Sequence, residues 1–156
     1  MEPILKIQIK LIKTINQKPL KLTNILLKFI KGKNMKVAIP TDSIGGLSDT
    51  VFNHFGMAPT YTIVEIVENR IGKIDIINNI SDHFGGSESP VDLLLRENVG
   101  IVICSNLGPR AMEVLTCQGF DLFFTKREKV QEVLDKFIKG QLERFSGEKT
   151  TCSSHR

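Results

Sequence analysis

One stretch, residues 101–112, constrains the fold most, because it has the pattern of a buried strand that runs directly into a helix. Residues 99–104 are a nearly continuous run of β-branched side chains, which is typical of a parallel strand covered on both faces. The polar segment 105–108 breaks this run, and Pro109 suits the first turn of a helix. The stretch therefore predicts a loop at the carboxyl end of a central strand, where open α/β sheets hold their ligands. A tight turn without a ligand is the alternative that this pattern leaves open.

The rest of the chain predicts three strands, followed by a helix, the central strand, a helix, a strand and a last helix. A hairpin turn joins the second and third strands, and a helix cap at Ser89 starts the first helix. Alternating helices and strands indicate right-handed crossovers between parallel strands. We therefore expect an α/β domain with a mixed five-stranded sheet and helices on its faces. The predicted strands are 35–40, 61–67, 73–78, 99–104 and 120–125, the hairpin turn is 68–72, the predicted helices are 90–98, 109–118 and a last one near 130–138, and a helical turn is predicted at 51–55.

The charge distribution divides the chain after residue 34. Residues 1–34 carry a net charge of +7 and residues 35–156 a net charge of −3. Met35 also opens the first predicted strand, so we predict a basic extension at 1–34, an α/β domain at 35–142 and a flexible tail at 143–156. The acidic balance of the domain lacks the electrostatic footprint of a nucleic-acid-binding protein.

The basic extension has lysines opposite isoleucines and leucines in two predicted amphipathic helices, which Pro19 separates. Lysines interrupt every apolar run, so we expect no membrane-spanning segment. Three explanations stay open: a helix lying on a membrane surface, a docking arm for a partner, and translated sequence upstream of a true start at Met35. We favour the third, because the composition changes at Met35.

The common catalytic motifs are missing from the sequence. There is no phosphate-binding Gly-x-x-x-x-Gly-Lys, no Gly-x-Ser-x-Gly nucleophile elbow and no His-Glu-x-x-His zinc motif. The acidic residues Asp42, Asp49 and Asp82 show no spacing that singles out an acid–base pair. The three cysteines, an odd number, argue against a disulfide framework and for a reducing cytoplasm. A binding role therefore outranks catalysis.

Three side chains near the predicted ligand edge are of types that bind metals. His54 lies in an apolar-flanked loop, His83 precedes a Gly-Gly pair, and Cys104 ends the central strand. Each also has an ordinary structural explanation. The histidines can be packed or hydrogen-bonded loop residues, and the cysteine can be a small apolar core residue. The residues alone leave both explanations open.

Four motifs occur in order: Met-Lys-Val-Ala-Ile-Pro-Thr-Asp at 35–42, Asn-His-Phe-Gly at 53–56 with Ala-Pro at 58–59, Gly-Gly at 85–86, and Leu-Gly-Pro-Arg-Ala at 107–111. With the closing helix, they resemble the dinitrogenase iron–molybdenum cofactor biosynthesis family over about residues 35–142. This resemblance implies a three-layer α/β/α fold with a ribonuclease-H-like motif but no nuclease activity. It also implies proteins that carry iron–sulfur precursors of the nitrogenase cofactor, with His54 helping to hold the cluster.

The leading hypothesis is a cytoplasmic, non-catalytic carrier of an iron–sulfur cluster or iron–molybdenum cofactor precursor, with a client protein that receives the cluster. One alternative is an enzyme that acts on a small anionic metabolite at the same sheet edge, with Arg110 supplying charge. Another is a protein-interaction module that uses the edge strand of the hairpin. No oligomeric state is predicted. The expected cofactor-binding residues are Asn53, His54, Cys104, Ser105, Asn106 and Gly108, and the expected metal ligands are His54 and His83.

We predict that a chain beginning at Met35 melts within a few degrees of the full chain, because the core already has enough amphipathic helices to cover its sheet. If the extension were instead part of the core, its removal would expose several apolar side chains, each contributing about 1.5 to 3 kcal/mol when buried. That loss would be a large part of a typical stability of about 5 to 15 kcal/mol. Thermal unfolding of both chains decides between the two cases, and a large drop in melting temperature would contradict the proposed start.

Overall fold

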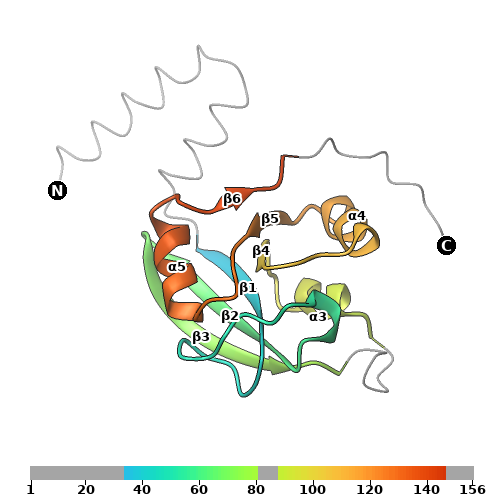
Figure 1. Ribbon diagram of the computed structural model, residues 1–156, viewed down its shortest axis with the longest axis horizontal. Coiled ribbons are helices and arrows are strands. Elements are labelled where there is room, and N and C mark those ends of the chain that lie inside the picture. The colour runs from blue at the N-terminus through green and yellow to red at the C-terminus, as the bar shows by residue number, and fades with distance from the viewer. Residues whose placement is uncertain (1–33, 81–87, 147–156) are drawn as a thin grey trace, which may run out of the picture. The chain divides into compact units, whose positions relative to one another are not determined.

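The computed structural model describes residues 34–80 and 88–146 (Figure 1). The chain divides into two units between Asn34 and Met35, the position at which the charge distribution changes. The second unit contains every helix and strand described below. The helices predicted within the basic extension lie outside the described residues, so they and the independence of the 35–142 domain stay predictions.

A mixed sheet of six strands organises the second unit, in the spatial order β3-β2-β1-β4-β5-β6. β1 pairs antiparallel with β2, and β2 with β3. On its other side, β1 pairs parallel with β4, and β4 with β5. The predicted α/β class and the parallel second half of the sheet are therefore confirmed. The strands are β1 (Met35–Thr41), β2 (Thr60–Val67), β3 (Arg70–Asn78), β4 (Ile101–Cys104), β5 (Asp121–Phe124) and β6 (Glu143–Arg144).

Helices pack on both faces of this sheet. α3 (Pro90–Arg96) and α4 (Pro109–Cys117) contribute Leu94 and Leu115 to one buried cluster, which includes Ala38 and Val102 of the sheet. α5 (Val130–Ile138) contributes Val133 and Leu134 to a second cluster with Val37, Ile39 and Ile103. Because neighbouring strand residues point to opposite faces, β1 and β4 supply both clusters and are covered on both sides. Within the described residues, the molecule therefore has helix, sheet and helix layers, whereas the ribonuclease-H-like character stays a prediction.

The expectation of five strands is wrong, because the sheet has a sixth strand in the predicted tail. β6 is only two residues long and pairs antiparallel with Phe123 and Phe124. Its position is fixed by an ion pair from Arg144 to Asp121 and by the edge-to-face contact of Phe145 with Phe124. A two-residue strand is too short to show the period-2 alternation by which strands are predicted. The sheet therefore continues beyond the predicted domain end at residue 142.

The hairpin turn is tighter than predicted. Glu68 and Asn69 form it, with φ values of 50° and 60°, which is the left-handed geometry of a two-residue hairpin loop. Gly72, expected in the turn, lies within β3, where Gly72 and Lys73 together oppose Glu65 in a β-bulge. A Cβ at Gly72 would lie 3.2 Å from the Glu65 carbonyl oxygen, which explains the glycine. The predicted turn at 51–55 is also displaced, to the short 3-10 helix η1 (Phe55–Met57).

Candidate functional site

Three loops leave the same edge of the sheet. β1, β4 and β5 are adjacent and parallel, so their carboxyl ends lie together. The loops that follow them are residues 42–54, 105–108 and 125–129. The parallel pairing of β1 with β4 brings the first two loops to one edge. We call this edge, with its three loops, the carboxyl edge.

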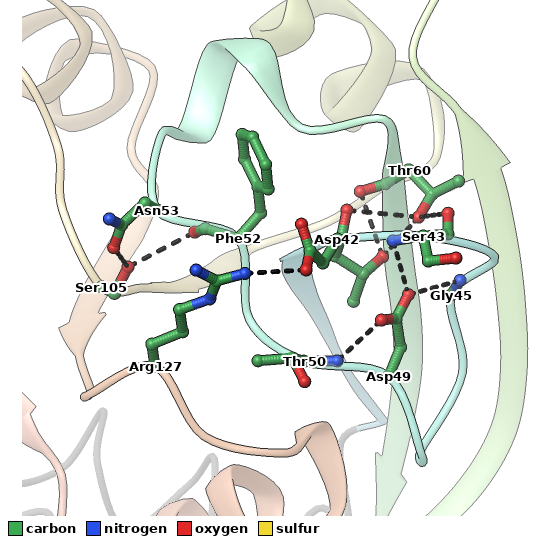
Figure 2. A network of polar contacts seen from close by, with 11 residues as sticks. Asp42, Ser43, Gly45, Asp49, Thr50, Phe52, Asn53, Thr60, Ser105 and Arg127 are labelled. Atoms are coloured by element: carbon green, nitrogen blue, oxygen red, sulfur yellow. Dashed lines mark hydrogen bonds and ion pairs between the residues drawn. The ribbon is translucent and has the colours of Figure 1, made fainter.

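The loop after β1 is folded around the carboxylate of Asp49 (Figure 2). Oδ2 of Asp49 accepts hydrogen bonds from the backbone N–H groups of Ser43, at 2.9 Å, and Gly45, at 2.7 Å. Oδ1 accepts a third from the N–H of Thr50, at 2.7 Å. Hydrogen bonds to an ionised acceptor are among the stronger ones in proteins. One side chain therefore closes the loop on itself.

Buried threonines attach this loop to the sheet. The hydroxyl of Thr41 lies 2.6 Å from that of Thr60 and 3.2 Å from that of Thr62. Thr60 Oγ1 donates to the carbonyl of Ser43, and Thr62 Oγ1 accepts from the N–H of Gly46 at 2.9 Å. Because these hydroxyls are buried, each needs a partner, and the loop supplies part of them.

The same loop also satisfies the amino terminus of α5. The N–H of Val130 donates to the Asp49 carbonyl at 2.9 Å, and the N–H of Gln131 donates to the Leu47 carbonyl at 3.0 Å. Lys129, the N-cap residue, contributes no side-chain hydrogen bond. The first N–H groups of a helix lack intrahelical acceptors, so the loop carbonyls replace a side-chain cap.

Three contacts connect the loops across the carboxyl edge (Figure 2). Oγ of Ser105 lies 3.3 Å from the Phe52 carbonyl oxygen and 3.2 Å from Oδ1 of Asn53. Arg127, after β5, donates to Asp42 Oδ2 at 2.7 Å. These contacts place four polar side chains, from the loops after three different strands, on one preorganised surface.

His54 is exposed on this surface. It is the N-cap residue of η1, but its side chain makes no capping hydrogen bond. Hydrogen bonds from two buried side chains fix the η1 turn that follows. The Tyr61 hydroxyl donates to the Phe55 carbonyl at 2.6 Å, and Asn79 Nδ2 donates to the carbonyls of Gly56 and Ala58 at 3.0 and 2.8 Å. The backbone beside His54 is therefore fixed, while its imidazole is open to solvent.

The other predicted binding residues on the carboxyl edge are also exposed or partly exposed. Asn53, Asn106 and Gly108 are exposed, and Ser105 is partly buried. Gly108 is the N-cap of α4, with φ −65° and ψ 155°, and a Cβ there would meet nothing within 4 Å. The fold itself therefore does not require a glycine at position 108. Its absent side chain keeps the amino terminus of α4 open.

Cys104 faces away from the carboxyl edge and belongs to the core. Its side chain is fully buried in the cluster that α3 and α4 cover. Burial raises the pKa of its thiol to about 12, so the thiol is protonated at neutral pH and is not the thiolate that binds metals. Cys117 differs from Cys104, because it is disulfide-bonded, whereas the odd cysteine count argued against a disulfide framework.

The metal-ligating residues of the described chain are dispersed. Residues 34–80 and 88–146 contain no group of three or more His, Cys, Asp or Glu side chains placed to share a metal ion. His83, the second predicted metal ligand, lies outside the described residues. Of the predicted ligands with metal-binding chemistry, His54 alone is described and exposed at the carboxyl edge.

Asp42, Asp49 and Arg127 were missed as contributors to the carboxyl edge. The sequence shows the two aspartates without a spacing that marks them, because their partners are backbone N–H groups and a side chain 85 residues away. The sequence pattern available at these positions was a polar segment after a strand. Such a segment predicts a loop, but it does not identify the side chain whose hydrogen bonds stabilise the loop.

An open hollow of about 530 Å³ is lined by residues of α5, of β6 and of the loop after β5, which belongs to the carboxyl edge. Its lining includes Lys136, whose Nζ donates to both carboxylate oxygens of Glu128 at 2.7 Å. None of the predicted binding residues that the structure describes lines this hollow. Two of its charged groups, Lys136 and Glu128, are paired with each other, so the loops after β1 and β4, which carry the predicted binding residues, are the better candidate site.

The fold and the carboxyl edge together define an α/β protein with a preorganised polar surface at one end of its parallel strands. Residues 35–140 match the family described as dinitrogenase iron-molybdenum cofactor. This match covers more than half of the chain, and the chain belongs to this family. The family resemblance of the sequence motifs is therefore confirmed.

Individual relatives agree with this assignment. An uncharacterized protein of Methanocaldococcus jannaschii is 30% identical over 120 residues, covering 76% of this chain and 98% of that protein. A solved structure from Thermotoga, which carries a provisional NifB designation, is 29% identical with a TM-score of 0.58, and covers 78% of this chain and 99% of its own. The apo form of the orange protein from Desulfovibrio gigas has a TM-score of 0.62 at 18% identity, covering 74% and 97%, and shows the fold alone.

Every helix of the described residues is too short or too polar to cross a lipid bilayer.

We predict that Asp49→Ala destabilises the domain by about 1.5 to 3 kcal/mol, because three backbone N–H groups lose a charged acceptor. Urea unfolding measures this change. Asp135→Ala is the matched control, since Asp135 is an exposed helical residue with one hydrogen bond to Gln131, and we expect its effect to stay within about 0.5 kcal/mol. Equal effects of the two substitutions would show that Asp49 does not organise the loop.

Proposed function

We propose that this protein is a carrier of an iron–sulfur cluster or an iron–molybdenum cofactor precursor, which it binds at the carboxyl edge. The observation that carries this proposal is the exposed imidazole of His54 on a fixed backbone, at the same edge of the sheet as the open amino terminus of α4. Family membership supports the nature of the cargo. In this role the protein acts in the cytoplasm and transfers its cargo to a client protein, without catalysing a reaction.

The chemistry of the carboxyl edge fits such a cargo. A neutral imidazole nitrogen is a ready ligand for iron. Helix amino termini favour anions through their unpaired N–H groups and the helix dipole, and α4 presents one beside Gly108 with no side-chain cap. Arg127 lies at the same edge, where its charge is paired with that of Asp42. The attraction for an anionic cluster therefore comes from the amino terminus of α4, and the described anchor is His54.

A small ligand set is suited to carrying rather than storing a cluster. Cys104 is excluded from the ligand set by its burial and raised pKa, which leaves His54 as the described ligand and His83 as the second candidate. A cluster held by few protein ligands keeps other coordination positions for small molecules or for a receiving protein. The geometry therefore supports binding that is reversible, as a carrier requires.

We expect His54→Ala to lose most of the iron that the protein binds after anaerobic reconstitution with ferrous iron and sulfide. The measurement is bound iron per chain together with visible absorption of the cluster. His155→Ala is the matched control, because it makes the same change outside residues 35–140, the range that matches the family. Cys104→Ala should keep the cluster as well, because the buried thiol is no ligand.

Three results would contradict the carrier proposal. The first is no bound iron in the unchanged protein above the His54→Ala level. The second is equal loss in His54→Ala and His155→Ala. The third is turnover of a small anionic metabolite by metal-free protein, which would favour an enzyme at the same edge.

We also expect Gly108→Val to weaken cluster binding while changing the free energy of unfolding by no more than about 1 kcal/mol. Valine fits the fold at this position, because its Cβ meets nothing within 4 Å, but its methyl groups cover the amino terminus of α4. Gly100→Val is the matched control. A Cβ at Gly100 would also meet nothing within 4 Å, and Gly100 precedes β4, at the strand end away from the carboxyl edge. Iron binding and urea unfolding are compared for both variants, and loss of folding in Gly108→Val would show that this glycine serves the turn alone.

A further inference from the structure

The two outermost strands of the sheet differ strongly in length. β6, on one side, has two residues, whereas β3, on the other side, has nine (Figure 1). An edge strand presents a row of backbone N–H and C=O groups that can pair with another chain, and short edge strands limit such pairing. The exposed length of β3 therefore makes it the edge at which a further strand can add.

Apolar side chains are exposed beside this edge. Ile76 of β3 is 49% exposed, although it lies in the middle of a strand pair with β2. The loop backbone packs on it, because a Cβ at Gly45 would lie 2.7 Å from Ile76 Cγ2. Ile44, the residue before Gly45, is 82% exposed. Two exposed isoleucines thus lie near the edge, where a second strand would cover apolar surface.

The charges on β3 are arranged for pairing with a copy of itself. Lys73 Nζ lies 3.2 Å from Asp75 Oδ2, and the two side chains are 67% and 40% exposed. In an antiparallel pair of β3 strands related by a two-fold axis at Ile74, Lys73 of each copy lies opposite Asp75 of the other. A shift by two residues in either direction places Asp75 opposite Asp75 or Lys73 opposite Lys73, and like charges directly opposite are destabilising.

The apolar residues agree with this register. Ile74 lies opposite Ile74 of the second copy, on the same side of the bulge as Asp75. The exposed Ile76 lies opposite Gly72, which has no side chain to obstruct it. Cross-strand apolar and opposite-charge pairs both stabilise antiparallel sheets. Charge and side-chain size therefore select the same alignment.

We propose that β3 forms an isologous dimer interface in which two copies of this chain pair antiparallel around Ile74 and join their sheets. The paired strands contain none of the predicted binding residues, which lie on the loops at the carboxyl edge. Ile44 and Gly45, beside the interface, belong to the loop after β1. This inference does not depend on the proposed cargo.

Sedimentation velocity of the full chain over a concentration series tests the interface. We expect the unchanged protein to dimerise and Asp75→Lys to weaken self-association by about tenfold or more, because it places Lys73 opposite a lysine. The double variant Lys73→Asp/Asp75→Lys restores opposite charges across the two-fold axis, so it should dimerise again. Glu113→Lys, an exposed residue of α4, is the control with the same change in net charge.

Circular dichroism and thermal unfolding accompany each variant, and the double variant contains the same lysine at position 75 as the single one. Recovery of the dimer in the double variant therefore separates a broken interface from a damaged fold. The proposal is overturned by a monomeric unchanged protein, by a dimer that persists in Asp75→Lys, by an equal loss in Glu113→Lys, or by no recovery in the double variant.

Discussion

The position of the candidate site depends on the carboxylate of Asp49. This group accepts N–H groups on both sides of the loop after β1, from Ser43 and Gly45 before it and from Thr50 directly after it. A loop of this length without regular structure gains little from backbone pairing alone, so a charged acceptor at its centre compensates for the entropy lost on ordering it. The segment that leads to Asn53 and His54 is fixed as a result.

The sequence predicts the elements with strong periodicity and misses those that depend on distant partners. The central strand is found within the predicted run 99–104, at Ile101–Cys104, and α4 starts at Pro109 as expected, because a buried strand and a helix start have local signatures. The cap at Ser89 is also confirmed by its hydrogen bond from the N–H of Asp92. β6 is missed, since Phe123 and Phe124 define it rather than its own two residues.

The sequence likewise predicts one feature of the candidate site, the position of its loops, and misses another, the orientation of its side chains. That the loops after β1 and β4 meet at one edge follows from the parallel pairing of these two strands. The sequence predicts a parallel second half of the sheet, but not which strands are neighbours. Which side chains point to that edge does not follow. Cys104 and Ser105 are adjacent in sequence, yet the thiol is buried in the core while the hydroxyl reaches Phe52 and Asn53. Successive residues of a strand alternate between faces, so the last strand residue cannot be assigned until the register is known.

The loop carbonyls that begin α5 have a mechanical consequence. The Leu47 and Asp49 carbonyls receive the first N–H groups of this helix, and α5 packs on the face opposite α3 and α4. A displacement of this loop at the carboxyl edge therefore changes the hydrogen bonds at the start of α5. The loop and the first turn of this helix form one hydrogen-bonded unit.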